Sequence, residues 1–147
     1  MQSILHNCEP RLGLTAVAAG QTTQVTAGVK MDDCEGVCFL AVMGAITANG
    51  VQSIKLQQSD DDGSADNYSD IEGSSVTIGD GDDNKVVPIE IYRPTKLWVR
   101  ASIQRATQDS VINSVVALKY GLKKAPHAAH STALAGKTLA GPAEGTA

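Results

Sequence analysis

The sequence predicts an all-β protein, a β-sandwich or barrel-like domain with extended N- and C-terminal arms. Three observations lead to this prediction. Short runs rich in Val, Ile and Thr follow one another along the middle of the chain, separated by turn residues. No stretch has the period of an amphipathic helix. Composition changes at both ends, so we expect an N-terminal arm at 1–20, a sandwich domain at 21–122 and a C-terminal arm at 123–147.

Length and composition suit one domain with a thin core. The chain has 147 residues, of which one is Phe, three are Tyr and one is Trp, so the core must come from aliphatic side chains. A thin core indicates that part of the stability comes from oligomerising or from docking on a larger surface. The net charge of -4, with acidic residues in the middle and lysines towards the end, argues against a nucleic-acid partner.

The N-terminal part is expected to begin without a regular element. Residues 1–20 contain Pro10, Gly13 and Gly20 with no sustained period, which favours an arm, and the first strand is expected at 21–26. The start shows no basic leader, and the longest apolar stretch is about half of what a spanning helix needs. We therefore expect a soluble chain made in a cytoplasm, with its three cysteines as free thiols.

The stretch 37–46 is apolar at alternating and intervening positions alike. This pattern is typical of a strand covered on both sides, and a short buried helix is the alternative. Asn49-Gly50, which follows, suits a type I′ turn. We therefore predict a β-hairpin that joins 37–46 to a strand at 51–58.

Three further strands are expected in the second half. One lies at 86–92, after a short run at 75–78, and its Pro88 predicts an edge position because proline donates no ladder hydrogen bond. Residues 96–105 alternate, which places four side chains inward, namely Leu97, Val99, Ala101 and Ile103. The stretch 111–120 is expected to pair with this strand across the turn 107–109.

The acidic stretch 59–72 is a candidate calcium site, because carboxylate oxygens are preferred Ca²⁺ ligands. An EF-hand needs glycine at its sixth position, and Gly63 would then place Gln58 at the first position, where a carboxylate is required. Calcium in an irregular loop and a solvated hairpin loop both remain open, here and at the acidic turn 79–84. We predict the solvated loops and no bound metal.

Neither zinc binding nor catalysis is predicted. His6 and the three cysteines could form a zinc site, but the closely paired ligand spacing is absent, and buried or inert thiols are the favoured alternative. His127 and His130 lie in the Ala-rich arm, and no nucleophile elbow or phosphate-binding glycine loop occurs. We therefore expect no enzyme activity and no cofactor.

A family resemblance begins in the run 54–64, Ile-Lys-Leu-Gln-Gln-Ser-Asp-Asp-Asp-Gly-Ser. With the acidic stretch after it, the Trp-Val-Arg strand at 98–100 and the end Glu-Gly-Thr-Ala, the chain resembles small head proteins of tailed bacteriophages, classed as decoration, cement or capsid-stabilising proteins. That family has a KLQxSDDGS hairpin, an RYVR-like strand and a Pro/His-containing tail, matched in order by 93–100 and 126–127. The likeness covers 49–147, with one extra Asp and with Leu97-Trp98 in place of the usual tyrosine.

The resemblance implies a sandwich that clusters on the capsid exterior, commonly as a homotrimer. The expected function is that of a structural virion protein, assembled in the bacterial host cytoplasm, which binds the outer capsid surface and stabilises the shell. Its expected partners are the major capsid protein and further copies of itself, without nucleic acid or membrane. The alternative is a minor phage surface or tail β-domain that binds a receptor or glycan.

Two sets of contact residues are expected. The C-terminal arm is the predicted capsid anchor, because its composition buries too little apolar area for it to order alone. Its candidate contacts are Lys123, Lys124, Pro126, His127, Lys137 and Glu144. Trp98 and Arg100 point outward from their strand, either onto a second sheet or into a subunit interface, where both residue types are frequent anchors.

Overall fold

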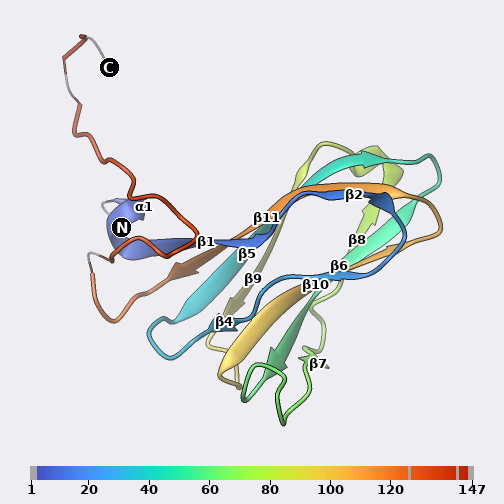
Figure 1. The fold of residues 1–147 in the computed structure, drawn as a ribbon, viewed down its shortest axis with the longest axis horizontal. Helices are drawn as coiled ribbons and strands as arrows, with labels where there is room; N and C mark the ends of the chain where they lie inside the picture. The colour runs from blue at the N-terminus through green and yellow to red at the C-terminus, as the bar shows by residue number, and fades with distance from the viewer. Residues whose placement is uncertain (1–2, 126, 142, 146–147) are drawn as a thin grey trace.

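The computed structural model describes residues 3–125, 127–141 and 143–145. Its two antiparallel sheets pack as a β-sandwich, which confirms the predicted fold class, and the described strands close no barrel (Figure 1). A helix α1 (Ile4–Asn7) and a 3-10 turn η1 (Asp80–Asp82) are short. No helix among the described residues has the length and apolar character to cross a membrane.

The sheets, named A and B here, contain five and six strands. Sheet A has the order β1 (Cys8–Leu14), β11 (Ser110–Tyr120), β5 (Gly36–Ile46), β9 (Val86–Tyr92), with β2 (Val17–Gly20) also paired to β11. Sheet B has the order β3 (Gln24–Val25), β10 (Trp98–Ala106), β6 (Val51–Ser59), β7 (Ser69–Asp70), with β4 (Val29–Lys30) paired to β10 and β8 (Val76–Gly79) to β6. Strand β9 is therefore an edge strand, as its proline predicts.

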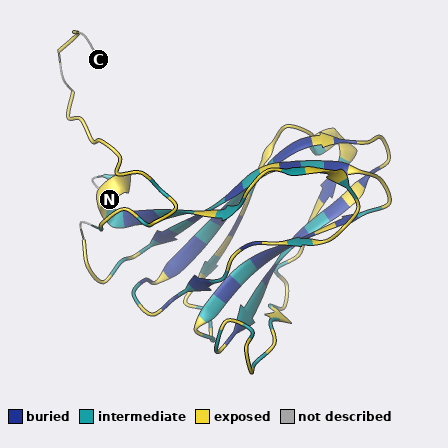
Figure 2. Cartoon of the chain, viewed as in Figure 1, coloured by how far each residue is buried: buried dark blue, intermediate teal, exposed yellow. Residues whose placement is uncertain are grey.

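The core lies between the sheets and is aliphatic. Inward side chains of β5, β10 and β11 are fully buried, among them Phe39, Ile103 and Val115. Figure 2 shows buried residues along the strands of both sheets and exposed residues in the loops and the C-terminal segment. Phe39 is the only buried residue among the five aromatics, all of which lie in the described part of the chain. Leu97, expected inward, precedes β10 and is exposed.

The prediction of an arm at 1–20 was wrong for most of its length. Strand β1 pairs with β11 from Cys8 to Leu14, and β2 pairs with the other half of β11. Pro10 fits because β1 is an edge strand, where a missing N–H is tolerated. A single strand β11 thus has both N-terminal strands on one side and β5 on the other.

Both predicted hairpins were wrong, because each connection crosses between sheets. Strands β5 and β6, on either side of Asn49-Gly50, belong to different sheets. Asn49 has a φ of 64°, but Gly50 has no positive φ, so the pair does not form the type I′ turn that returns a strand beside its neighbour. In the same way β10 lies in sheet B and β11 in sheet A. Alternation predicts a strand but does not say which sheet it joins.

Arg105 stabilises the crossing from β10 to β11 from inside the sandwich. Its side chain is 3% exposed and donates to the carbonyl oxygens of Ala18, Thr22 and Ser110 at 2.7–2.8 Å. A further bond reaches the Thr22 hydroxyl at 3.0 Å. The guanidinium therefore satisfies carbonyl groups that the strand ladders leave free, and it ties the loop after β2 to the start of β11.

We predict that Arg105→Met lowers the free energy of unfolding by about 2–4 kcal/mol, because one buried and two partly buried carbonyl groups lose their donor. Urea unfolding followed by circular dichroism measures the change. Arg93→Met is the control, since Arg93 is 67% exposed and its ion pair with Glu35 lies at the surface. Equal stability of the two variants would contradict this role of Arg105.

Candidate functional site

The two ends of the chain meet along the free edge of β1. The Thr132 hydroxyl accepts a hydrogen bond from the Leu12 backbone N–H at 3.0 Å, and the hydroxyls of Ser3 and Thr138 lie 3.4 Å apart. We call this region, formed by 3–14 and 127–138, the terminal junction. Beyond it the C-terminal segment leaves the sandwich (Figure 1), and no helix or strand occurs in the described residues from Lys123 onward.

A buried ion pair lies beneath the terminal junction. Glu9 of β1 and Lys119 of β11 are direct partners in the strand register and are only 2% and 1% exposed. Lys119 Nζ lies 3.4 Å from Glu9 Oε2 and also forms an ion pair with Asp33, in the loop between β4 and β5. One ammonium group therefore connects two strands and a loop.

The C-terminal segment contributes to the same cluster through His127. Its Nε2 lies 3.2 Å from Glu9 Oε2, an oxygen with no hydrogen-bond donor among the described groups, while Arg11 donates to Glu9 Oε1 at 2.8 Å. Burial alone would raise the pKa of Glu9. The hydrogen bond from Arg11 and the positive charges of Lys119 and Arg11 outweigh burial and lower this pKa. Glu9 is thus held ionised inside the protein.

Glu9, Asp33 and His127 form the one group in the described residues whose ligand atoms lie close enough, within 4.8 Å, to hold a metal ion. The ammonium of Lys119 already contacts both carboxylates. It supplies the positive charge that a cation would otherwise bring. This arrangement has the chemistry of an ion-pair network, and nothing in it requires a metal.

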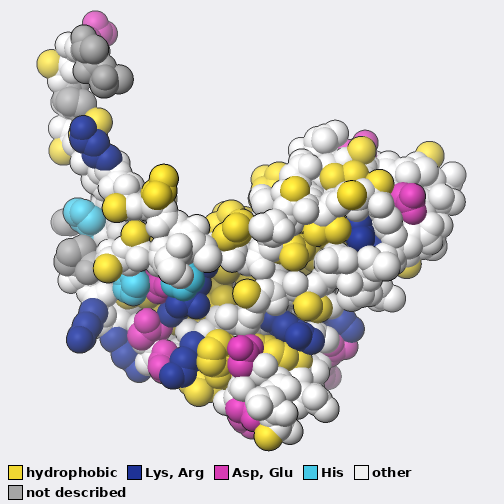
Figure 3. Space-filling view, viewed as in Figure 1, with side chains coloured by type: hydrophobic (Ala, Val, Ile, Leu, Met, Phe, Trp, Pro, Cys, Tyr) yellow, Lys and Arg dark blue, Asp and Glu magenta, His cyan; other side chains and the backbone are white. Residues whose placement is uncertain are grey.

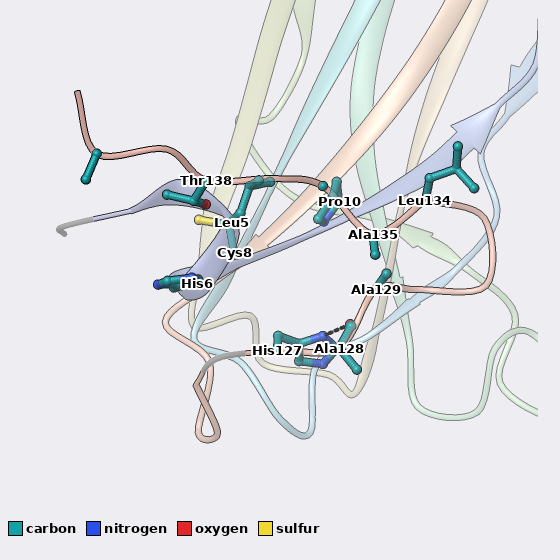
Figure 4. A pocket seen from close by; sticks show the side chains of 12 residues that line it. Leu5, His6, Cys8, Pro10, His127, Ala128, Ala129, Leu134, Ala135 and Thr138 are labelled. Carbon is teal, nitrogen blue, oxygen red and sulfur yellow. Dashed lines mark hydrogen bonds between the residues drawn. The ribbon is translucent and has the colours of Figure 1, made fainter. Parts of the chain in front are cut away.

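An open cleft of about 330 Å³ lies between the two chain ends (Figure 4). Its lining is mainly apolar, with Leu5, Pro10 and Leu134 on its walls and the His127 ring at one side. Cys8 also lines it, but burial raises the pKa of this thiol and so disfavours the nucleophilic thiolate. The cleft can accept an apolar side chain more readily than it can support acid–base chemistry.

The predicted anchor residues are spread along the C-terminal segment. Lys123 is exposed, but its backbone N–H donates to the Asp33 carbonyl at 2.9 Å, so the segment starts attached to the sandwich. Lys124, Lys137 and Glu144 are exposed, and only His127 reaches the buried cluster. Pro126 lies outside the described residues.

Trp98 and Arg100 lie on the outer side of sheet B, away from sheet A. Arg100 donates to Gln57 Oε1 at 2.9 Å, and its guanidinium stacks 4.0 Å from the centre of the Tyr68 ring. Trp98 is half-buried beside its strand partners Lys30 and Ser59. The alternative in which this pair packs on the second sheet was therefore wrong.

The acidic loop after β6 is ordered by its own carboxylates. Asp61 accepts backbone hydrogen bonds from Ser64, Ala65 and Asp66 at 2.7–3.1 Å, and these bonds lower its pKa. Lys96 forms ion pairs with Asp60 and Asp66. The acidic side chains thus turn towards backbone amides of the loop and towards Lys96, which lies just before β10.

The comparisons with known proteins add little to this geometry. No family model and no curated protein matches the chain. One similar solved structure comes from Bacillus endospore appendages, described as disulfide-linked pili, with a TM-score of 0.47, 9% identity and coverage of 80% of this chain and 90% of the other. A Clostridium thermocellum xylanase with CBM22-1 and GH10 modules has a TM-score of 0.42 and 14% identity, and the match covers 80% of this chain and 28% of the xylanase chain. Latent PorU of Porphyromonas gingivalis has a TM-score of 0.38 and 9% identity, and the match covers 78% of this chain and 13% of the PorU chain. These scores are too low to carry an inference about function.

We predict that Lys119→Met destabilises the fold by about 3–5 kcal/mol, because Glu9 and Asp33 lose the ammonium group that they share inside the protein. Urea unfolding at neutral pH measures the loss. Lys124→Met provides the control, since Lys124 is exposed and its replacement should change the stability by less than about 0.5 kcal/mol. A stable Lys119→Met protein would show that the buried pair is not needed.

The lowered pKa of Glu9 gives the fold a predicted acid sensitivity. The folded chain binds fewer protons at this carboxyl than the unfolded chain does, where its pKa is near 4.5. Its contribution to stability is therefore complete above that value and is lost as the pH falls through the lowered folded pKa.

Melting temperatures measured from neutral to acidic pH should fall more steeply for the natural chain than for Glu9→Gln. Other carboxylates with lowered pKa values, such as Asp61 and Asp70, are present in both proteins, so the difference between the two curves isolates Glu9. Parallel curves would contradict the assignment.

Proposed function

We propose that the chain is a structural virion protein that binds the outer surface of a tailed-phage capsid and stabilises the shell. The C-terminal segment carries this proposal. It is fixed to the sandwich at the terminal junction, where Leu134 is 95% exposed, and it leaves the sandwich beyond Thr138, with Leu139 60% exposed. Figure 3 shows the segment standing clear of the sandwich with hydrophobic and charged side chains on it. An exposed segment of this kind suits docking on a larger assembly.

Beyond Thr138, the composition of the segment explains why it would order on a partner and not alone. Ordering costs about 1–2 kcal/mol per residue in backbone entropy, and small residues bury too little area to offset it. A capsid surface would cover the two leucines, and each buried leucine contributes about 1.5–3 kcal/mol. Lys123, Lys124 and Lys137 would lie near acidic capsid groups, so binding should weaken with salt.

Leu134→Ser combined with Leu139→Ser should weaken binding to heads by about tenfold or more, because the segment loses its two exposed leucines. The assay is co-sedimentation with purified heads that lack the protein, from the phage that encodes it. Val51→Ser with Val76→Ser is the matched control, since these valines are 49% and 40% exposed on strands of sheet B. The control should bind as the natural chain does.

Two outcomes would overturn the proposal. If the natural chain does not co-sediment with heads, the capsid is not its partner. If immunogold labelling places a few copies on the tail and none on the head, the receptor- or glycan-binding alternative replaces the decoration role.

A further inference from the structure

The outer face of sheet A, which points away from sheet B, is apolar across four strands. We call its side chains the apolar face. They are Pro10 and Leu12 of β1, Val116 and Leu118 of β11, Cys38, Leu40 and Val42 of β5, and Val86 and Pro88 of β9. One charged side chain lies on the same face, the exposed Glu90 of β9, which is the strand partner of Cys38. One row of direct strand partners runs from Leu12 through Val116 and Leu40 to Pro88.

The apolar face is accessible to solvent. On β5 the inward residues Phe39 and Ala41 are fully buried, whereas Leu40 between them is partly exposed. Exposure rises towards both edges, to 40% at Leu12 and 54% at Val86. The strand β5 is therefore apolar on both sides, as the sequence predicts for a strand covered twice, but the described chain covers only one of them.

Sheet B shows the ordinary arrangement of an antiparallel sheet, with one face in the core and one polar face in water. Its outer side carries Arg100, hydrogen-bonded to Gln57, and Lys55, paired with Asp70 at 2.6 Å. A sandwich with one polar and one apolar outer face is expected to bury the apolar one, because large exposed apolar patches mark interaction surfaces.

Neither edge of sheet A is suited to extending the sheet. The C-terminal segment covers the β1 edge through the bond from Leu12 to Thr132. At the other edge, the bonds from Met43 to the Lys85 carbonyl and from Arg93 to the Glu35 carbonyl show that odd-numbered residues of β9 bond to β5. Even-numbered residues therefore face the open edge, where Pro88 has no N–H to donate. The face, and not the edge, is the free surface.

We propose that two copies of this chain pack together through the apolar face around a two-fold axis. In the proposed role the chain would be free in water before it binds a shell, so the apolar face would need a cover from the time of folding. The chain offers one matching apolar surface for that purpose, the same face of a second copy, and a two-fold contact joins identical patches. The proposed pair rests on the proposed function. It names the partner of the apolar face, a surface that capsid binding through the C-terminal segment does not use.

The size of the face agrees with such a contact. Four strands spaced about 4.8 Å apart and about seven residues long give a flat area of about 450 Å² per copy. This area lies below the roughly 800 Å² per partner of standard interfaces, so it suits a pair that forms and separates with protein concentration. A homotrimer would instead require each apolar face to meet a different surface of its neighbour, and the outer face of sheet B is polar.

The test measures the mass of the purified chain by light scattering at micromolar concentration. We expect twice 15.3 kDa for the natural chain. Leu40→Glu, in the middle of the face, should give 15.3 kDa with an unchanged circular dichroism spectrum. Gln104→Glu is the matched control on the outer side of sheet B and should remain paired, because its position is exposed and polar.

Cys38 gives a second readout that needs no substitution. It lies on the apolar face beside Leu118, so pairing should slow its reaction with a maleimide by about tenfold or more as the protein concentration rises through the dissociation constant. Cys34, which is buried and lies off this face, serves as the internal reference within the same chain. Mass spectrometry assigns the label to each cysteine.

A mass of 15.3 kDa for the natural chain, or of three times that value, would overturn the two-fold pair. So would a folded Leu40→Glu protein that stays paired, or a rate of Cys38 labelling that does not change with protein concentration. These experiments use the free protein alone. Loss of head binding in an intact pair would therefore overturn the capsid role and leave the pair standing.

Discussion

The ammonium group of Lys119 is the point on which the arrangement of the chain ends depends. It lies on the inner side of β11 at an almost fully buried position and meets Glu9 of β1 and Asp33 of the loop before β5. His127 joins through Oε2 of Glu9, the same oxygen that Lys119 contacts. Because an unpaired buried charge is costly, this network stabilises the N-terminal strand, the loop and the start of the C-terminal segment in one arrangement.

This network determines which parts of sheet A remain open. It fixes the C-terminal segment where the Thr132 hydroxyl can meet the backbone of Leu12, so the β1 edge is covered. The opposite edge is protected by Pro88, which removes one donor. The outer face of sheet A then remains as its large apolar surface. The outer face of sheet B is polar and offers no such surface.

The sequence predicts strands well here and their pairing poorly. Alternation at 96–105 and the proline at 88 locate β10 and an edge strand, since both signals are local. The two hairpins were wrong because the crossing between sheets depends on φ at Gly50 and on the buried Arg105, neither of which alternation reveals. The N-terminal strands were missed because they form on β11, a hundred residues away along the chain. One signal for the buried cluster was present, since Lys119 falls on the inward side with Val115 and Ala117.

Pairing and docking would support each other. The C-terminal segment alone offers two exposed leucines and few charges, which gives a weak contact with any one capsid site. In the proposed pair each copy carries such a segment at its β1 edge, where the segment borders the apolar face at Pro10. The second segment then binds at the high effective concentration set by the first, so that two weak contacts give one firm attachment. A thin aliphatic core would suffice for such a protein, because the interface of the proposed pair would bury the apolar surface that the core of one chain leaves exposed.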